Sequence, residues 1–438
     1  MAMKVSVIGL GYLGATHAVA MSKIGHTVIG IEPNQSKVDS LNSGSAGFFE
    51  PGLDEELATQ LASGRLSFRT SHDESSKDVD VHFICVGTPQ LEGSLAADTS
   101  YLHSAIKDLA PYLSLDAVVV GKSTVPVGTA ALLSAELNKL TGFDANLAWN
   151  PEFLKEGTAL EDSLNPDRLV VGVTNEHSEN KLREVFAPMI SAGVPFIVTD
   201  LATAELVKSA ANAFLATKIS FINAMAEIAE VSGADASQLA TAIGYDERIG
   251  NKFLRNGVGF GGGCLPKDIR ALMARAEELG VGQSVAYLKE IDKINIRRRD
   301  RVLAMLTEEL GTLEGKSILV LGAAFKPDSD DVRDSPALEI ALLLNNAGAI
   351  AIVHDPIALP GVNKKHPELA TEQDLLKAFS GVDAVVLATE WQEYRQLDPN
   401  TIVGMNNKFI IDGRNVLDTL KWQAAGFKVL ALGKTIKN

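Results

Sequence analysis

Short apolar runs alternate with helical patterns towards both ends of the chain. The runs cover residues 4–8, 27–32, 80–86, 116–121 and 145–149, and they return at 316–322, 349–355, 383–390 and 409–412. Between these two sets, apolar residues recur with a helical period over 202–231 and 285–310. Continuous apolar runs separated by helices are typical of the buried strands of parallel sheets. The pattern therefore predicts an α/β fold, with two Rossmann-like doubly wound parallel-sheet domains joined by a central all-helical domain that has a long connecting helix.

The same alternation predicts three domains, because 438 residues exceed what one core supports. The expected boundaries are 1–200 for a cofactor-binding domain, 201–312 for the helical domain with a dimer interface, and 313–438 for a second α/β domain. A net charge of −15 argues against a nucleic-acid partner. No apolar run is long enough to span a bilayer, so we expect a soluble, cytoplasmic protein without a membrane partner.

A glycine motif follows the first apolar run directly. Gly9, Gly11 and Gly14 form GxGxxG between a strand and a helix, and the next strand ends at Glu32. In this context the glycines let backbone amides approach a pyrophosphate at the helix N-terminus, while the acid binds ribose hydroxyls. A carboxylate also repels a 2′-phosphate. The motif therefore predicts NAD rather than NADP.

Two later strands end in loops that contain threonines. Thr88 follows the run at 80–86, and Thr124 lies in the loop at 122–129. The carboxyl ends of parallel strands are where such sheets bind ligands, so both threonines are candidates to face the cofactor. Capping of a turn is an equally good interpretation of either one. We expect Cys85 to lie in the core.

The other cysteine, Cys264, stands at the end of the glycine-rich run GVGFGGG and before LPKD. Pro266 suits the first turn of a helix, so Cys264 is expected at a helix N-terminus, with Lys267 nearby. Both features favour the thiolate, and the pattern predicts a nucleophile. The alternative is a small buried residue in a tight turn. Two cysteines give no disulfide framework and no zinc-site spacing, so no metal is predicted.

Four further sets of charged residues have open interpretations. Glu152 and Glu156 would share one side of a helical turn, as a general base or as solvated acids. Lys208 lies beside an apolar stripe, where a lysine usually extends to the surface. Residues 297–299 are all arginine; the cluster could bind an anion, but a solvated helix face is the better interpretation. Lys326 and Arg333 precede a helix start at 335–336, a good place for a phosphate.

Several motifs in one order give the chain a clear resemblance. GLGYLG, CVGTP, KSTVPVGT, NPEFLKEG, KSAANAF, GFGGGCLPKD and AFKPDSDDVRDSP resemble, over essentially the whole chain, the nucleotide-sugar 6-dehydrogenases that include UDP-glucose and GDP-mannose dehydrogenase. The chain looks most like the UDP-glucose branch. The alternatives within the family are GDP-mannose or another UDP-hexose. Departures from many relatives are Gly263 in place of Ser, Glu32 in place of Asp, and Phe253 in place of Tyr.

The resemblance implies a four-electron oxidation of UDP-glucose to UDP-glucuronate with two NAD. Cys264 would form a thiohemiacetal and then a thioester, and Lys208, helped by Asn212, would stabilise the oxyanion. Asp268 would orient water or a proton, and Glu152 would act as base in hydrolysis. Thr124 completes the implied catalytic set.

The resemblance also implies the binding residues. NAD would contact Gly9, Gly11, Leu13, Gly14, Glu32, Lys37, Thr88, Thr124, Glu156, Lys267 and Arg333. The substrate would contact Glu152, Phe153, Leu154, Lys155, Glu156, Lys208, Asn212, Phe253, Leu254, Arg255, Asn256, Gly257, Gly261 and Lys326. Arg248 would reach the substrate of a neighbouring subunit, which implies a homodimer.

Two other classes of protein remain alternatives. A non-catalytic sensor of NAD and nucleotide sugars predicts the loss of Cys264, Lys208 or Asp268, and all three are present. A two-electron hydroxyacid dehydrogenase leaves the cysteine loop and the second α/β domain unexplained.

Overall fold

The structure is a computed structural model that describes residues 2–434. The chain divides into two compact units. Unit 1 comprises residues 2–211 and 270–280, and unit 2 comprises residues 212–269 and 281–434. None of the helices within 2–434 combines the length and the apolar composition needed to cross a membrane.

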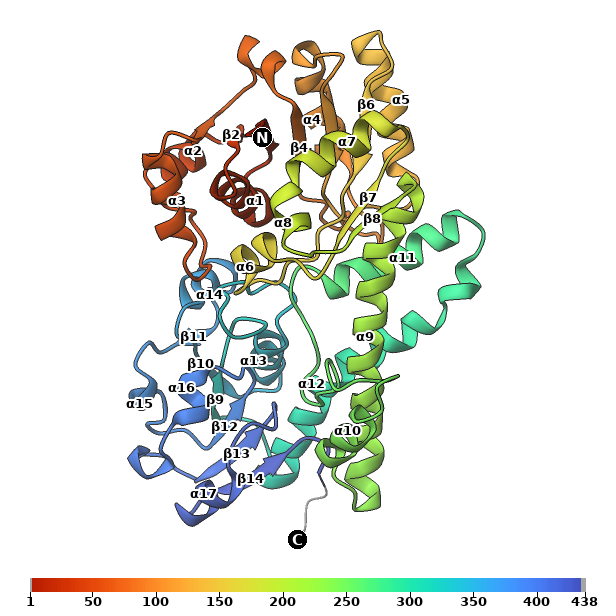
Figure 1. Cartoon of the computed structure of the whole chain (residues 1–438). Helices are drawn as coiled ribbons and strands as arrows, with labels where there is room; N and C mark the ends of the chain where they lie inside the picture. Colours follow the sequence, from red (N-terminus) through yellow and green to blue (C-terminus); the bar gives the residue numbers. More distant parts are fainter. Residues whose placement is uncertain (1, 435–438) are drawn as a thin grey trace. The chain divides into compact units, whose positions relative to one another are not determined.

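An eight-stranded sheet forms the centre of unit 1 (Figure 1). Its strand order is β3-β2-β1-β4-β5-β6-β7-β8, and all neighbours are parallel except β6 and β7. The first six strands have the Rossmann order. The strands are β1 Lys4–Ile8, β2 Thr27–Ile31, β3 Leu66–Arg69, β4 Val81–Ile84, β5 Val118–Gly121, β6 Asn146–Trp149, β7 Leu169–Gly172 and β8 Phe196–Thr199.

Helices cover both faces of this sheet, which explains why β4 and β5 are buried at every residue. Two apolar clusters fill the two faces. Phe83 and Phe186 belong to one cluster, and Leu102 and Trp149 belong to the other. The helices are α1 Tyr12–Lys23, α2 Gln35–Asn42, α3 Leu53–Ala62, α4 Ser100–Leu109, α5 Thr129–Thr141, α6 Ala159–Leu164, α7 Glu176–Val185 and α8 Ala187–Ser191.

Helices also make up the middle of the chain. The longest, α9, is 32 residues long and continues from unit 1 into unit 2. Its sequence contains neither glycine nor proline, so no residue interrupts the helical hydrogen bonds. These helices are α9 Leu201–Ser232, α10 Ala236–Gly244, α11 Leu265–Glu278 and α12 Tyr287–Leu310.

A second parallel sheet follows in unit 2, with its strands side by side in the blue part of Figure 1. Its order, β11-β10-β9-β12-β13-β14, again matches a doubly wound fold. The strands are β9 Ser317–Leu321, β10 Ile350–His354, β11 Ala370–Thr371, β12 Ala384–Leu387, β13 Phe409–Asp412 and β14 Lys428–Ala431. The helices are α13 Pro336–Asn346, α14 Leu359–Lys365, α15 Leu375–Ala378, α16 Gln392–Gln396 and α17 Thr419–Ala424.

The predicted fold class is confirmed: two doubly wound sheets and a helical middle region are present. The solvated face predicted for residues 297–299 is wrong for two of the three arginines. Arg297 is exposed, but Arg298 and Arg299 are only 1% and 4% exposed. Arg298 pairs with Glu230, and Arg299 pairs with Glu339. Ionic partners on α9 and α13 therefore allow these arginines to be buried.

Candidate functional site

The glycine motif lies where a dinucleotide fold requires it, between β1 and α1. A Cβ on Gly14 would lie 1.8 Å from the carbonyl oxygen of Gly9, so only glycine allows this close packing. Glu32 follows β2, and its carboxylate accepts a hydrogen bond of 3.1 Å from the Leu10 N–H. Lys37 lies 3.8 Å from the same carboxylate. The backbone of the glycine motif and the Glu32 carboxylate therefore fit NAD. Leu13 lies within the same motif.

The two predicted threonine loops lie together at the carboxyl ends of β4 and β5. The Thr88 hydroxyl donates a hydrogen bond of 2.7 Å to the Thr124 carbonyl oxygen. Cys85, directly after β4, is buried as predicted. The loops from two adjacent strands are thus fixed to each other beside the glycine motif.

A buried carboxylate from α9 fixes the loop that contains Thr124. Glu205 accepts hydrogen bonds of 2.7 and 2.6 Å from the N–H groups of Gly128 and Ala130, at the start of α5. Burial raises the pKa of Glu205, while these backbone hydrogen bonds lower it. The contact joins the first turns of α9, which carry Lys208, to the loop after β5.

The segment that contains Glu152 and Glu156 is not helical, so the predicted helical turn is wrong. Residues 150–155 have no regular structure, and α6 begins only at Ala159. Buried Glu50 holds this segment: its carboxylate accepts from the Gly157 N–H at 2.6 Å and from the Ala159 N–H at 2.6 Å. The Tyr12 hydroxyl donates to the same carboxylate. One acid therefore ties the segment to the glycine motif.

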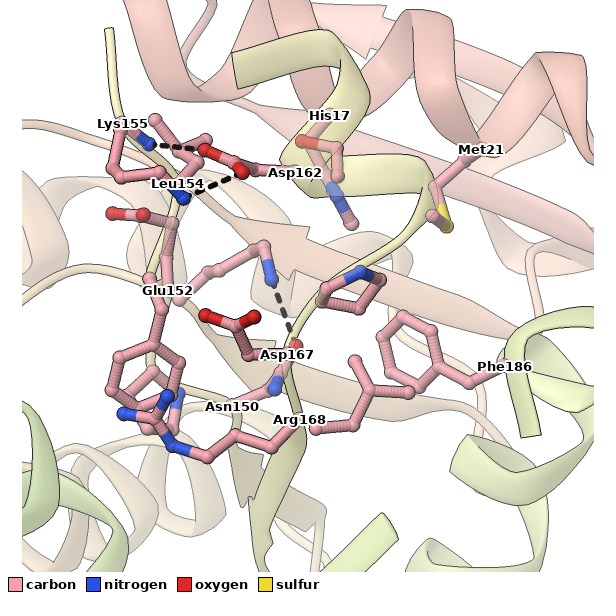
Figure 2. A pocket seen from close by; sticks show the side chains of 16 residues that line it. His17, Met21, Asn150, Glu152, Leu154, Lys155, Asp162, Asp167, Arg168 and Phe186 are labelled. Carbon is pink, nitrogen blue, oxygen red and sulfur yellow. Dashed lines mark hydrogen bonds and ion pairs between the residues drawn. The ribbon is translucent and has the colours of Figure 1, made fainter. Parts of the chain in front are cut away.

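A pocket in unit 1 is lined by this segment (Figure 2). Phe153, Leu154 and Lys155 contribute to its wall together with Glu152. Lys155 forms an ion pair of 2.6 Å with Asp162. Four of the residues predicted to contact the substrate are thus neighbours in one pocket.

Lys208 is buried, and the surface interpretation of this lysine is wrong. Its side chain is 7% exposed, and its Nζ lies 3.8 Å from Glu152 Oε2. The Phe153 ring lies beneath the Lys208 ammonium at 5.5 Å and beneath the Arg168 guanidinium at 3.9 Å. A lysine in this position keeps a cation beside Glu152 in a largely water-free environment.

Cys264 lies directly before α11, as predicted, and is exposed. Its carbonyl oxygen accepts from the Asp268 N–H at 2.9 Å, so the cysteine begins the helix. Asp268 is buried, and it accepts from Asn212 at 2.6 Å and from Lys267 at 2.6 Å. Three predicted site residues therefore form one hydrogen-bonded group, with Lys267 and Asp268 in the turn after the thiol and Asn212 on α9.

Side chains from α9 and α12 hold the glycine loop before Cys264. Asn295 accepts from the Phe260 N–H at 2.7 Å and donates to the Phe260 carbonyl at 2.9 Å. Arg299 donates to the same carbonyl at 3.2 Å. Asn223 accepts from the Gly257 N–H at 2.9 Å. The loop backbone is therefore fixed, although its glycines contribute no side chains.

The C-terminal sheet contributes further contacts to this loop. Arg414 donates to the Gly259 carbonyl at 2.9 Å, and the Gly262 N–H donates to the Arg333 carbonyl at 2.9 Å. Gly262 has φ +86°, and a Cβ there would meet the Phe325 ring at 2.8 Å. Phe325, the residue before Lys326, therefore packs against the cysteine loop.

The other predicted substrate residues lie on the segment before the glycine loop. Phe253 has a left-handed φ of +64°, which is uncommon for an aromatic residue. Leu254 packs in an apolar cluster, and the Asn256 amide donates to the Leu432 carbonyl at 2.7 Å. Arg255 is exposed. Gly261 packs against the Asp334 backbone, and Arg248 is exposed and pairs with Asp246.

The predicted NAD residues divide between the two units. Lys267 and Arg333 belong to unit 2, and the others belong to unit 1. Sequence reasoning missed the residues that hold these loops, because only tertiary contacts reveal what they hold. These residues are Glu50, Glu205, Asn223, Asn295, Arg299 and Arg414.

A dinucleotide-binding fold followed by a helical segment with a cysteine loop is typical of dehydrogenases that use NAD. Three models of one dehydrogenase family match the chain. The NAD binding domain of the UDP-glucose/GDP-mannose dehydrogenase family matches residues 3–190. Its central domain matches 202–297, and its UDP binding domain matches 319–419. The chain therefore belongs to this family and is an NAD-dependent dehydrogenase.

Full-length relatives have the same organisation. The chain is 41% identical to a UDP-glucose 6-dehydrogenase of Rickettsia typhi, covering 99% of this chain and 100% of the relative. It is 38% identical to a UDP-glucose 6-dehydrogenase of Bacillus subtilis, covering 99% and 98%. A solved UDP-glucose dehydrogenase from Pyrobaculum islandicum is 36% identical with a TM-score of 0.92, covering 100% of this chain and 98% of that one.

The two cysteines should react very differently with an alkylating reagent. Burial raises the pKa of Cys85 to about 12, while Cys264 is exposed at a helix N-terminus. We expect iodoacetamide to modify Cys264 faster than Cys85, by on the order of a hundredfold or more at pH 8. Peptide mass mapping of the folded enzyme measures this ratio, and Cys264→Ser should abolish the fast reaction. Faster labelling of Cys85 would contradict the assignment.

Proposed function

We propose that this enzyme oxidises UDP-glucose to UDP-glucuronate and uses two NAD for each sugar. The full-length relatives named above are UDP-glucose dehydrogenases, and the third family domain is a UDP binding domain. The observation that supports the chemistry most strongly is the position of Cys264, exposed at the start of α11 on a loop held by side chains. An exposed thiol on a fixed loop suits covalent capture of an aldehyde.

NAD would be held by the glycine motif, with Glu32 on the ribose and Thr88 and Thr124 on the loops beside it. Lys37, Leu13, Glu156, Lys267 and Arg333 complete the proposed set. When bound, NAD accepts a hydride from the sugar C6 in each of the two oxidations. The fit of the backbone at Gly14 and the acid after β2 supports this assignment.

Cys264 carries the covalent chemistry in this proposal. Its sulfur adds to the aldehyde carbon, and the resulting oxygen takes a proton to give a thiohemiacetal. The second oxidation of that carbon leaves a thioester. Water then adds to the thioester carbonyl, the carbon–sulfur bond breaks, and the products are the carboxylate and the cysteine thiolate. Covalent capture keeps the reactive aldehyde on the enzyme.

Lys208 would stabilise the oxygen that becomes negative during these steps, with help from Asn212. Its burial supports this role, since a cation acts more strongly away from water. Asp268 would orient the transferred proton or water, and its bonds from Asn212 and Lys267 fix its carboxylate. Glu152 would take the proton of the attacking water, near Thr124.

The substrate would be bound by two stretches and by Lys326, which would hold the diphosphate. The first stretch, 152–156, lines the unit 1 pocket, and the second, 253–257 with Gly261, precedes the cysteine. We further propose the domain boundaries 1–200, 201–312 and 313–438. A cytoplasmic location remains a prediction.

A Cys264→Ser variant tests the covalent scheme. We expect steady turnover of UDP-glucose to fall on the order of a thousandfold or more, since the nucleophile is lost. Binding of NAD and UDP-glucose, measured by calorimetry, should change by less than about threefold. Cys85→Ala is the matched control and should retain most of the turnover. A Cys264→Ser enzyme with normal turnover would refute the scheme.

We also propose that the enzyme is a homodimer that buries one side of α9. Phe214, Phe221 and Ile228 are seven residues apart on this helix, so they share a face, and they are 65%, 46% and 56% exposed. Large apolar side chains in such a stripe are typical of an interface. Arg248, exposed on the segment after α10, would then reach the partner's substrate.

Replacing Phe221 with glutamate should convert the dimer to a monomer, because it would bury a charge in the interface. Light scattering measures the mass in solution. Leu420→Glu, at a 78% exposed leucine of α17, is the control and should leave the mass unchanged. The dimer proposal is refuted if the unmodified chain has the mass of a monomer.

A further inference from the structure

Lys122 is a buried cation that none of the roles above uses. It follows β5 directly and is 8% exposed. Its Nζ donates a hydrogen bond of 2.9 Å to Asn150 Oδ1, and the Asn150 amide donates to the Val170 carbonyl at 2.8 Å. Lys122 thereby connects the ends of β5 and β6 to β7. Asn150 stands only two residues before Glu152.

The surroundings of Lys122 are electrostatically linked to Glu152. Burial lowers the pKa of Lys122; Cys85 and Glu152 oppose this effect, and Lys208 adds to it. Lys208 itself lies 3.8 Å from Glu152 Oε2. Two buried lysines therefore interact with Glu152, Lys122 from the loop after β5 and Lys208 from α9.

The pocket of Figure 2 brings these groups together. Lys122, Asn150 and Glu152 line it, with His17 from α1 on another side. Burial is the main cause of a His17 pKa well below the usual value, and Lys122 contributes, so the imidazole is neutral. The two other cations of the wall have partners of their own: Lys155 pairs with Asp162, and Arg168 packs on Phe153.

Burying a lysine at this position costs more free energy than burying an apolar side chain of similar size. A methionine would occupy a similar volume and would avoid the cost of removing an ammonium group from water. A lysine at this position therefore has a consequence that apolar packing would not provide, and the acid of the proposed mechanism that lines the same pocket is Glu152.

We propose that Lys122 is a positioning residue for Glu152 in the hydrolysis of the Cys264 thioester. The inference rests on the proposed function. In this step the water oxygen bonds to the thioester carbon, the water proton passes to Glu152, and the Cys264 sulfur leaves with the electron pair of the broken bond. Through its hydrogen bond to Asn150, Lys122 fixes the backbone two residues before Glu152, the group that must accept that proton, and Lys122 lines the same pocket as Glu152.

The test compares Lys122→Met with Glu152→Gln in the full-length enzyme, supplied with UDP-glucose and excess NAD. NADH is followed from the first turnover, and the reaction is quenched in acid for intact-protein mass spectrometry. We expect both variants to form two NADH per active site in the first turnover and then to slow on the order of tenfold to a hundredfold. The thioester adduct on Cys264 should accumulate in both. The double variant should be no slower than Glu152→Gln alone.

Lys181→Met is the matched control, since Lys181 is a half-buried lysine of unit 1 paired with Asp116 and Asp80. It should neither slow turnover nor accumulate an adduct. If Glu152→Gln accumulates the adduct and Lys122→Met does not, the proposed function stands and the role of Lys122 is overturned. The role of Lys122 is also overturned if Lys122→Met slows the first NADH burst as much as later turnovers. An equal effect on both phases is what a purely structural role predicts. If the unmodified enzyme forms no NADH, both the proposed function and the inference that rests on it are refuted.

Discussion

The position of the Cys264 thiol depends on hydrogen bonds made to a backbone that could otherwise move. Glycines before the cysteine allow close packing, but they have the highest conformational entropy in the unfolded chain and contribute no side chains. Asn223 and Asn295 therefore bind the loop from two helices, and Arg299 and Arg414 bind its carbonyls. These contacts hold the loop that carries the proposed nucleophile.

Unit 1 uses buried charges in a similar way. Glu50 and Glu205 each accept two backbone N–H groups at a helix start, where such groups lack partners within the helix. Glu50 joins the glycine motif to the segment with Glu152, and Glu205 joins the loop with Thr124 to α9. Lys122 adds a cation at the ends of three strands. The buried ionic groups thus lie between the segments that carry the proposed chemistry.

The sequence alone predicted those features of the fold and the site that depend on a local pattern of residues. The glycine motif with Glu32, the helix start after Cys264 and the doubly wound sheets follow from spacing and apolar runs, and all are present. The sequence did not predict features that depend on contacts between residues far apart in the chain, such as the burial of charged side chains. Burial of Arg298 and Arg299 depends on acids 68 and 40 residues away, respectively, and the resemblance alone suggested the role of buried Lys208. The antiparallel pairing of β6 and β7 and the irregular backbone at 150–155 also depend on packing that no periodicity encodes.

In the proposed reaction one enzyme performs two oxidations on one carbon without releasing the aldehyde. The number of NADH formed per UDP-glucose tests this when the sugar nucleotide is limiting, NAD is in excess and a carbonyl-trapping reagent is present. We expect two NADH per sugar and no trapped aldehyde. One NADH per sugar, or an aldehyde captured by the reagent, would contradict it. NADH formed from GDP-mannose and not from UDP-glucose would contradict the proposed substrate while leaving the covalent chemistry in place.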